Sequence, residues 1–240
     1  MKPYLAHTAS ELRLTLRQGE QLLVSLGIPL VLLGFFTAVD VLPTGEAEPV
    51  DFLTPGILAL AVMGNAMVSL GIGTGFERSY GVLKRLGTTP LGRPRLVAAK
   101  TSVVLVVAVV QTLLVGALAF ALGWDPTGGA LVAPVAVVLG AAAFAGIGLT
   151  LAGRLPGLTN LAVTNGLYLA LLLLGGMVFP LDELPRGLEL VAKATPAAAL
   201  STVLRAALAG ADVPGWSVVV LLLWALVAPL AAALTFRWEA

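Results

Sequence analysis

Long runs of apolar residues, separated by short polar segments, dominate the pattern along the chain. A helix needs about 20 apolar residues to cross a hydrocarbon core of ~30 Å, and six runs of about that length are present. They cover Gln21–Val41, Pro55–Phe76, Leu96–Leu122, Ala130–Ala152, Leu158–Phe179 and Trp216–Phe236. None shows the alternation expected of a membrane β-barrel. The pattern therefore predicts an all-α integral membrane protein, with residues 1–240 forming a single transmembrane domain of six helices.

Composition supports this prediction and excludes several kinds of chemistry. Hydrophobic residues make up 58% of the chain and charged residues 11%, less than half of the ~25% usual in soluble domains. Cysteine is absent, which rules out disulfides, thiol nucleophiles and Cys-ligated metals. The single histidine, His7, lies outside the apolar runs, so we expect neither His-based catalysis nor a metal site in the membrane. A net charge of +1 gives no general attraction to nucleic acid.

The distribution of charge predicts how the chain is oriented. Eleven of the 14 basic residues fall on one side of the predicted spans, namely Lys2, Arg13, Arg17, Arg78, Lys84, Arg85, Arg93, Arg95, Lys100, Arg154 and Arg237. The other three are Arg186, Lys193 and Arg205, in the last long loop, and acidic residues favour that same side. Since basic loops stay in the cytoplasm, both termini are expected there.

Three polar segments have helical patterns of their own. Thr8–Glu20 predicts either an amphipathic helix along the cytoplasmic membrane interface, in contact with lipid headgroups, or an extension of the first span. The loop Glu77–Arg95 predicts a short helix, Ser79–Leu86, which either docks on a cytoplasmic protein or is an ordinary basic loop. Pro180–Gly215 predicts two short amphipathic helices that rest on or dip into the outer leaflet.

The predicted spans contain little that suggests chemistry. Lys100-Thr101 lacks the preceding glycines of a P-loop, and no acidic residue lies near the centre of a span. Asn65, Thr164 and Asn165 either hydrogen-bond between helices or line a substrate path. Gly71 and Gly75 have the small-xxx-small spacing that lets another helix approach closely. With no charged residue to hold a charged solute, we expect an apolar or amphipathic substrate.

Two segments resemble the signatures of ABC-2 type transporter permeases, most closely the small export permeases of the daunorubicin-resistance, multidrug type. Residues 54–100 resemble the family's second span and the loop after it, and the matching positions are Pro55, Gly56, Glu77, Arg78, Gly81, Leu83, Arg85, Pro90 and Lys100. Residues 175–208 resemble the signature at the end of span five, through Gly176, Phe179, Pro180, Leu184, Pro185, Pro196 and Arg205.

This resemblance implies a non-catalytic permease subunit of an ABC exporter in the inner membrane of a bacterium. The family pairs two permease chains, identical or paralogous, with two copies of a separate ATPase that holds ATP and Mg²⁺. This chain would need no cofactor of its own. Coupling to the ATPase would involve Glu77, Arg78, Gly81, Leu83, Lys84, Arg85 and Pro90. A re-entrant extracellular hairpin, which closes the outer mouth, would contain Gly176, Phe179, Pro180, Leu184, Pro185, Pro196 and Arg205.

Three other functions remain open from the sequence. A secondary transporter or channel without an ATPase would have buried ionisable groups or broken helices in mid-membrane. A membrane-embedded enzyme acting on lipids would need a His, Asp or Cys cluster. An assembly or anchoring protein could bind the ATPase and transport nothing.

Overall fold

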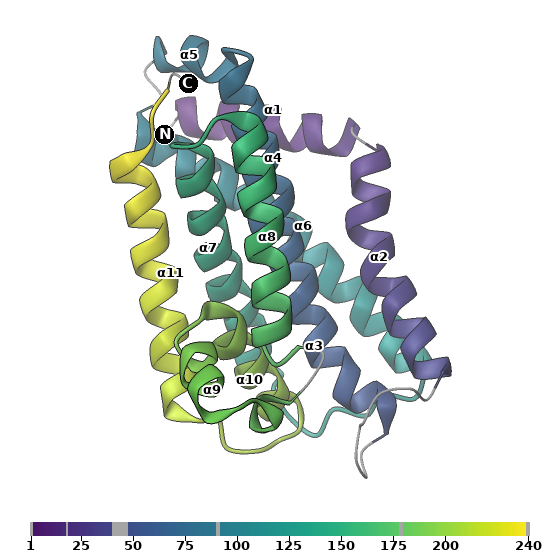
Figure 1. Cartoon of the computed structure of the whole chain (residues 1–240). Coiled ribbons are helices and arrows are strands. Elements are labelled where there is room, and N and C mark those ends of the chain that lie inside the picture. The colour runs from purple at the N-terminus through teal and green to yellow at the C-terminus, as the bar shows by residue number, and fades with distance from the viewer. Residues whose placement is uncertain (1, 18, 40–47, 90–91, 178–179, 239–240) are drawn as a thin grey trace.

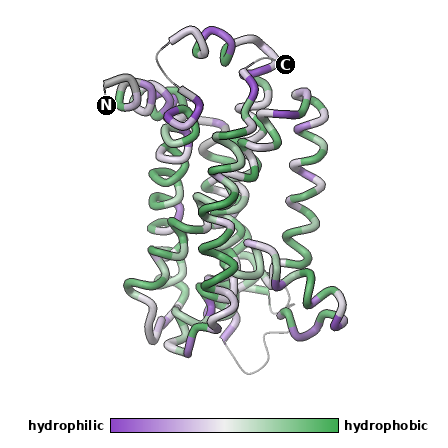
Figure 2. The backbone as a smooth tube through the Cα atoms, turned by 90° about the vertical axis from the view of Figure 1, so that its left-hand side faces the viewer, coloured by the Kyte–Doolittle hydropathy of each residue, from purple (hydrophilic) through white to green (hydrophobic). Residues whose placement is uncertain are grey.

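The molecule is a bundle of helices that run between two ends (Figure 1). The computed structural model describes residues 2–17, 19–39, 48–89, 92–177 and 180–238, and within these ranges every regular element is a helix. One end carries the first and last described residues and α5 (Val82–Gly87), and we term it the α5 end. The opposite end carries α10 (Pro196–Leu208), and we term it the α10 end. Because every regular element is a helix, the all-α prediction is confirmed for the described residues. Hydrophobic residues predominate along the middle of the long helices, and hydrophilic residues gather near their ends (Figure 2).

Among the residues that the structure describes, five helices are long and apolar enough to cross a membrane. They are the continuous helix Pro49–Ser79, α6 (Arg93–Ala121), α7 (Val132–Ala152), α8 (Gly157–Leu174) and α11 (Gly215–Thr235). These correspond to the second to sixth predicted spans, although α8 ends before the predicted Phe179, at a turn in which Gly176 has a left-handed φ of 64°. The first predicted span falls on α2 (Gly19–Ala38), whose searched apolar part, Leu23–Ala38, is shorter than the other five. That α2 forms the first span, which would bring the number of spans to six, therefore stays a prediction.

Glycines let the helices around α7 approach closely. A Cβ at Gly71 would lie 3.0 Å from the Cα of Gly148 in α7, and a Cβ at Gly75 would collide with the side chain of Asn160 in α8. The predicted close approach at Gly71 and Gly75 is thus confirmed. A Cβ at Gly146 would meet the backbone of α11. Because α7 packs against α4 (Leu70–Ser79), α6, α10 and α11, it forms the centre of the bundle (Figure 1).

The long helix Pro49–Ser79 changes its winding in the middle. It consists of α3 (Pro49–Met63), the π-helix η1 (Gly64–Ser69) and α4 (Leu70–Ser79). Widened turns of this kind are rare and often occur at functional sites. Within η1, the buried Asn65 donates its amide to the carbonyl of Val104 in α6 at 3.2 Å. This bond joins the widened turn to the neighbouring span.

The N-terminal segment forms a helix of its own, α1 (Lys2–Arg17), which lies across the α5 end rather than extending α2 (Figure 1). Its apolar and polar residues are segregated as in an amphipathic helix. The hydroxyl groups of Tyr4 and Ser102 hydrogen-bond at 2.7 Å, which attaches α1 to α6. The segment is therefore a separate helix and not an extension of α2, while its contact with a membrane interface stays a prediction.

Two short helices precede α11, as predicted. They are α9 (Arg186–Lys193) and α10, which begins where the Thr195 hydroxyl caps the amide of Ala198. The apolar residues Leu188, Leu190 and Val191 of α9 are exposed. By contrast, α10 is mostly buried and packs against α3, α7 and α11, so it is surrounded by other helices of the protein. Whether the pair forms a re-entrant hairpin stays a prediction.

Candidate functional site

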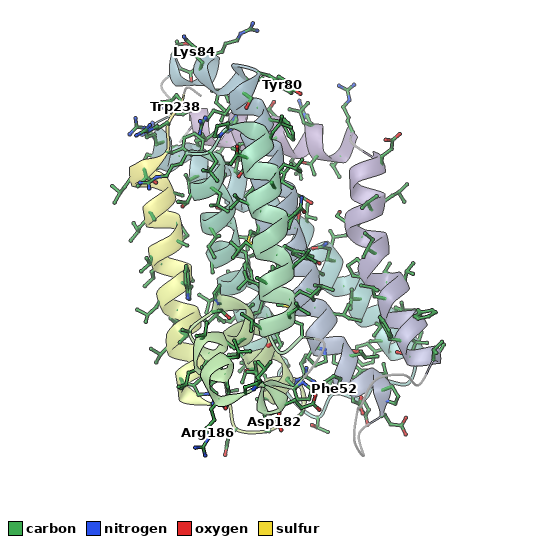
Figure 3. The ribbon with its side chains drawn as sticks, viewed as in Figure 1. Phe52, Tyr80, Lys84, Asp182, Arg186 and Trp238 are labelled. Carbon is green, nitrogen blue, oxygen red and sulfur yellow. The ribbon has the colours of Figure 1, made fainter. Side chains whose placement is uncertain are left out.

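The short helix α5 stands at the tip of the α5 end and is held there by a small apolar cluster. Leu83 is fully buried against Leu96 and Phe236, and Trp238 packs on the same cluster. The side chain of Tyr80 is 77% exposed, and Tyr80 and Lys84 both lie at this tip (Figure 3). A helix with one buried anchor and an exposed polar side is suited to contact a partner beyond the bundle.

A glycine separates α5 from α4 and sets where it begins. The predicted helix Ser79–Leu86 is instead divided, since Ser79 is the last residue of α4 and α5 starts only at Val82. Between them Gly81 has a φ of 73°, in the left-handed region that non-glycine residues rarely adopt. The boundary prediction was wrong because this turn lies inside a continuous helical pattern. Pro90 falls outside the described residues.

Arg78 fixes the end of α4 to the end of α7. It is buried, and its Nη1 donates to the carbonyl of Ala152, the last residue of α7, at 2.8 Å. The last carbonyls of a helix have no partner within it and carry its partial negative charge, so a guanidinium is well matched to this position. Movement of α4 is thus coupled mechanically to α7.

Glu77 points into the bundle, toward a lysine on α6. The Nζ of Lys100 lies 2.9 Å from Oε2 of Glu77 and 3.1 Å from Oε1 of Glu11 on α1. Lys100 is only 2% exposed, which few lysines are unless they are paired. One ammonium therefore joins α1, α4 and α6. We term Glu11, Glu77 and Lys100 the charge cluster.

His7 extends the charge cluster by one turn along α1. Its Nε2 lies 3.4 Å from Oε1 of Glu11. Burial lowers the pKa of His7 below the usual 6.5, and the nearby ammonium of Lys100 acts in the same direction, while Glu11 and Glu77 oppose them. His7 is therefore neutral at pH 7, and among the described residues the two carboxylates share one cation, Lys100.

A cavity of about 360 Å³ opens beside the charge cluster. Its walls come from α1, α2, η1, α4, α6 and the start of α5. Polar lining residues include Glu11, Glu77, Lys100 and Asn65, and the valines of α6 form an apolar wall. Its volume falls within the range of roughly 300–1,000 Å³ typical of small-molecule sites.

The three predicted substrate-path residues do not lie together. Asn65 lines the cavity, as noted above. Thr164 is buried and donates to Oδ1 of Asn160, whose amide in turn donates to the carbonyl of Gly71 at 2.9 Å. Asn165 is exposed on α8 and donates to its own helix at Leu161. Asn160, which Thr164 supports within α8, thus holds α8 to α4, whereas Asn65 is the one of the three predicted residues that lines this cavity.

At the α10 end, Arg205 connects three parts of the chain. Its Nη1 donates to the carbonyl of Phe52 in α3 and its Nη2 to that of Gly176, each at 3.0 Å. The guanidinium carbon also lies 3.9 Å from the centre of the Phe52 ring. Burial lowers the pKa of Arg205 to about 10, so it stays charged at neutral pH. The described part of the predicted hairpin is thus tied to the start of the second span.

A glycine of the other predicted signature also contacts this region. A Cβ at Gly56 would collide with the carbonyl of Met177, which explains why a glycine follows Pro55. The remaining predicted hairpin residues lie around the short helices. Pro180, Pro185 and Pro196 each stand at the start of a short helix, and Leu184 lies between the first two of these helices. Phe179 lies outside the described residues, and the role of this region as a gate stays a prediction.

Sequence reasoning missed the charge cluster as a unit. Lys100 was noted only for its charge and its place in a motif, although a single cation inside an otherwise apolar run is a signal of buried pairing. Its partner Glu11 is far away in sequence, so no local pattern connects them. Within the described residues, no group of three or more His, Asp or Glu side chains is arranged to hold a metal ion.

Together these features define a multi-pass helical membrane protein with an exposed short helix after its Pro49–Ser79 span. The model of the ABC-2 type transporter family matches residues 4–209. The chain belongs to this family, and is thus the membrane permease component of an ABC-type transporter. No curated protein matches the chain significantly.

Proposed function

We propose that this protein is the transmembrane permease subunit of an ABC exporter. It moves an apolar or amphipathic substrate, a drug, an antibiotic or a lipid-like molecule, out across the bacterial cytoplasmic membrane. A separate ATPase subunit supplies the energy. The observation that carries the proposal is α5, a short helix anchored by Leu83 and displayed at the tip of the bundle.

The proposed orientation rests on charge. Lys84 and Arg85 of α5 lie at the same end as the basic N-terminal helix, which supports a cytoplasmic location for this end. The α10 end then faces outward, with α2 as the sixth span. Two such chains, identical or paralogous, would form the substrate path between them and each bind one ATPase subunit.

The contacts around α5 suggest how ATPase movement reaches the membrane. When the ATPase closes, it displaces α5, and the short turn at Gly81 passes this movement to α4. Arg78 transmits it to α7, and Glu77 transmits it through Lys100 to α6 and α1. Arg78 is buried and Glu77 faces inward, so these two residues act as transmission points rather than as the docking surface. Coupling requires that the ATP-bound partner favour one permease conformation.

A co-purification experiment tests the proposal. The tagged chain is expressed with its genomic neighbours, purified and reconstituted in nanodiscs for an ATPase assay. We expect an ATPase subunit in about equal amount, and its loss in Arg85→Glu. Arg186→Glu is the matched control, because Arg186 is also an exposed arginine on a short helix, but at the α10 end.

Two results would contradict the proposal. If the chain purifies without any ATPase, an ATPase-independent transporter or channel explains it better. If Arg85→Glu and Arg186→Glu retain the ATPase equally, α5 is not the docking helix.

A further inference from the structure

The cavity beside the charge cluster has an excess of negative charge. Among the described residues, three charged side chains line it, Glu11, Glu77 and Lys100. The ammonium of Lys100 already contacts both carboxylates, so one negative charge in this wall is not balanced. An anionic ligand would therefore be repelled here, whereas a cation would complete the pairing.

A second observation points to a ligand at the same place. Thr74 lines the cavity and its side chain is fully buried, yet its hydroxyl has no hydrogen-bond partner within the described part of the chain. Leaving a buried hydroxyl unpaired is costly, and threonines in helices usually bond to the preceding turn. A ligand with an N–H donor would supply the missing partner.

The remaining walls suit an amphipathic molecule. Phe76 and Tyr80 both line the cavity, and their rings stack with centroids 6.1 Å apart. Aromatic faces attract cations. On the α6 side, Val103, Val104 and Val107 provide an apolar surface, along which a hydrocarbon tail is stabilised by burial.

We propose that this cavity binds an amphipathic organic cation. Its ammonium group lies against Glu11, Glu77 and the Thr74 hydroxyl, beside the two aromatic rings, and its hydrocarbon part lies along the α6 valines. The inference goes beyond the proposed function, because it assigns a binding site and a ligand class within a single chain. Binding needs neither ATP nor the ATPase, so its failure is distinguishable from failure of the co-purification experiment.

The test uses three probes with equal tails and different charge. Octylammonium, octanol and octanesulfonate are titrated by calorimetry into lipid nanodiscs containing the purified chain, and the heats from empty nanodiscs are subtracted. We expect saturable binding of octylammonium, at least about tenfold tighter than that of octanol or octanesulfonate. Equal or tighter binding of octanesulfonate would overturn the proposal, as would the absence of saturable octylammonium binding.

Variants locate the site. Glu77→Gln removes the excess charge and should weaken octylammonium binding by at least about tenfold. Glu189→Gln is the matched control, since Glu189 also pairs with a lysine, but at the α10 end, and it should change nothing. Thr74→Val keeps the shape and removes an unpaired hydroxyl, so it should fold and weaken binding about fivefold. If Glu77→Gln does not fold, Thr74→Val and the three probes still test the proposal. Unchanged affinity of Thr74→Val for octylammonium would overturn the predicted ligand position.

Discussion

Replacing Lys100 by methionine is the most informative single change, because it removes the shared cation and keeps most of the side-chain volume. Glu11 and Glu77 then remain in place without the ammonium that lies 3.1 and 2.9 Å from them. At an effective dielectric constant of 20, each of these contacts corresponds to about 5 kcal/mol of Coulomb attraction. Desolvation of the buried lysine offsets much of that attraction, and removing one partner of a buried pair typically costs about 3–5 kcal/mol.

A surface ion pair in the same chain gives the comparison. Lys193 lies 2.6 Å from Glu189 in α9, and its side chain is 39% exposed. Because solvent screens such pairs, Lys193→Met should cost only about 1 kcal/mol or less. We therefore expect Lys100→Met to lower the free energy of unfolding several times more than Lys193→Met does, although Lys193→Met removes the shorter contact.

Reversible unfolding in mixed micelles measures both variants. The triple variant Lys100→Met, Glu11→Gln and Glu77→Gln removes all three charges and should recover most of the loss, since no unpaired charge remains buried. If Lys100→Met costs no more than Lys193→Met, or if the triple variant is less stable than Lys100→Met, the charge cluster does not hold α1, α4 and α6 together.

Three further predictions concern other parts of the bundle. Gly56→Ala places a methyl group against the carbonyl of Met177 and should lower the thermal midpoint, whereas Gly166→Ala, with nothing within 4 Å of the new Cβ, should raise it slightly; equal shifts would contradict the close packing at Met177. Arg205→Lys cannot keep both carbonyl contacts and the ring contact, so it should cost about 2 kcal/mol and speed amide hydrogen exchange in α10; unchanged exchange would refute the connecting role. Burial lowers the pKa of His7 in the folded state below 6.5, so the unfolded state binds the proton more readily. The contribution of His7 to the docking of α1 is therefore present above pH 6.5 and is lost as the pH falls below that value. The protection factors for hydrogen exchange in α1, which correct for the pH dependence of the intrinsic rate, should then fall on acidification in the natural chain and fall less in His7→Gln, and equal falls would exclude His7 as the cause.

Some of this architecture is readable from the sequence because the membrane imposes it. The apolar runs that became α6, α7 and α11 were located to within a few residues, since hydrocarbon thickness sets their length. Thr195-Pro196 marks a helix start by side-chain capping and by a fixed φ, and such a start is readable from the sequence as well. Both signals depend on residues that are neighbours in the chain.

The parts that were missed depend on contacts between distant residues. Glu11 and Lys100 are brought together only by packing of α1 on α6, and a carboxylate on an amphipathic helix is usually solvated. The reason for Gly56 is a carbonyl at Met177, on a different segment. The sequence predicts α10 to be amphipathic, yet Ala197–Ala199 are buried together with Leu200 and Leu204, so the helix is apolar nearly all round, as buried helices are.

The π-helix at Gly64–Ser69 has a consequence for the phase of the long helix in which it lies. A widened turn contains an extra residue, and each residue of an α-helix turns the chain by about 100°. The faces of α3 and α4 are therefore offset, and a helical wheel drawn continuously from Pro49 would rotate Gly71 and Gly75 away from the helices they contact. Deleting one residue within 64–69 would restore regular winding and keep the present faces of α4, whereas inserting one residue there would turn α4 about its axis by about 100°. After the insertion Arg78 and Glu77 would face the wrong neighbours, although every residue of α4 would still be present.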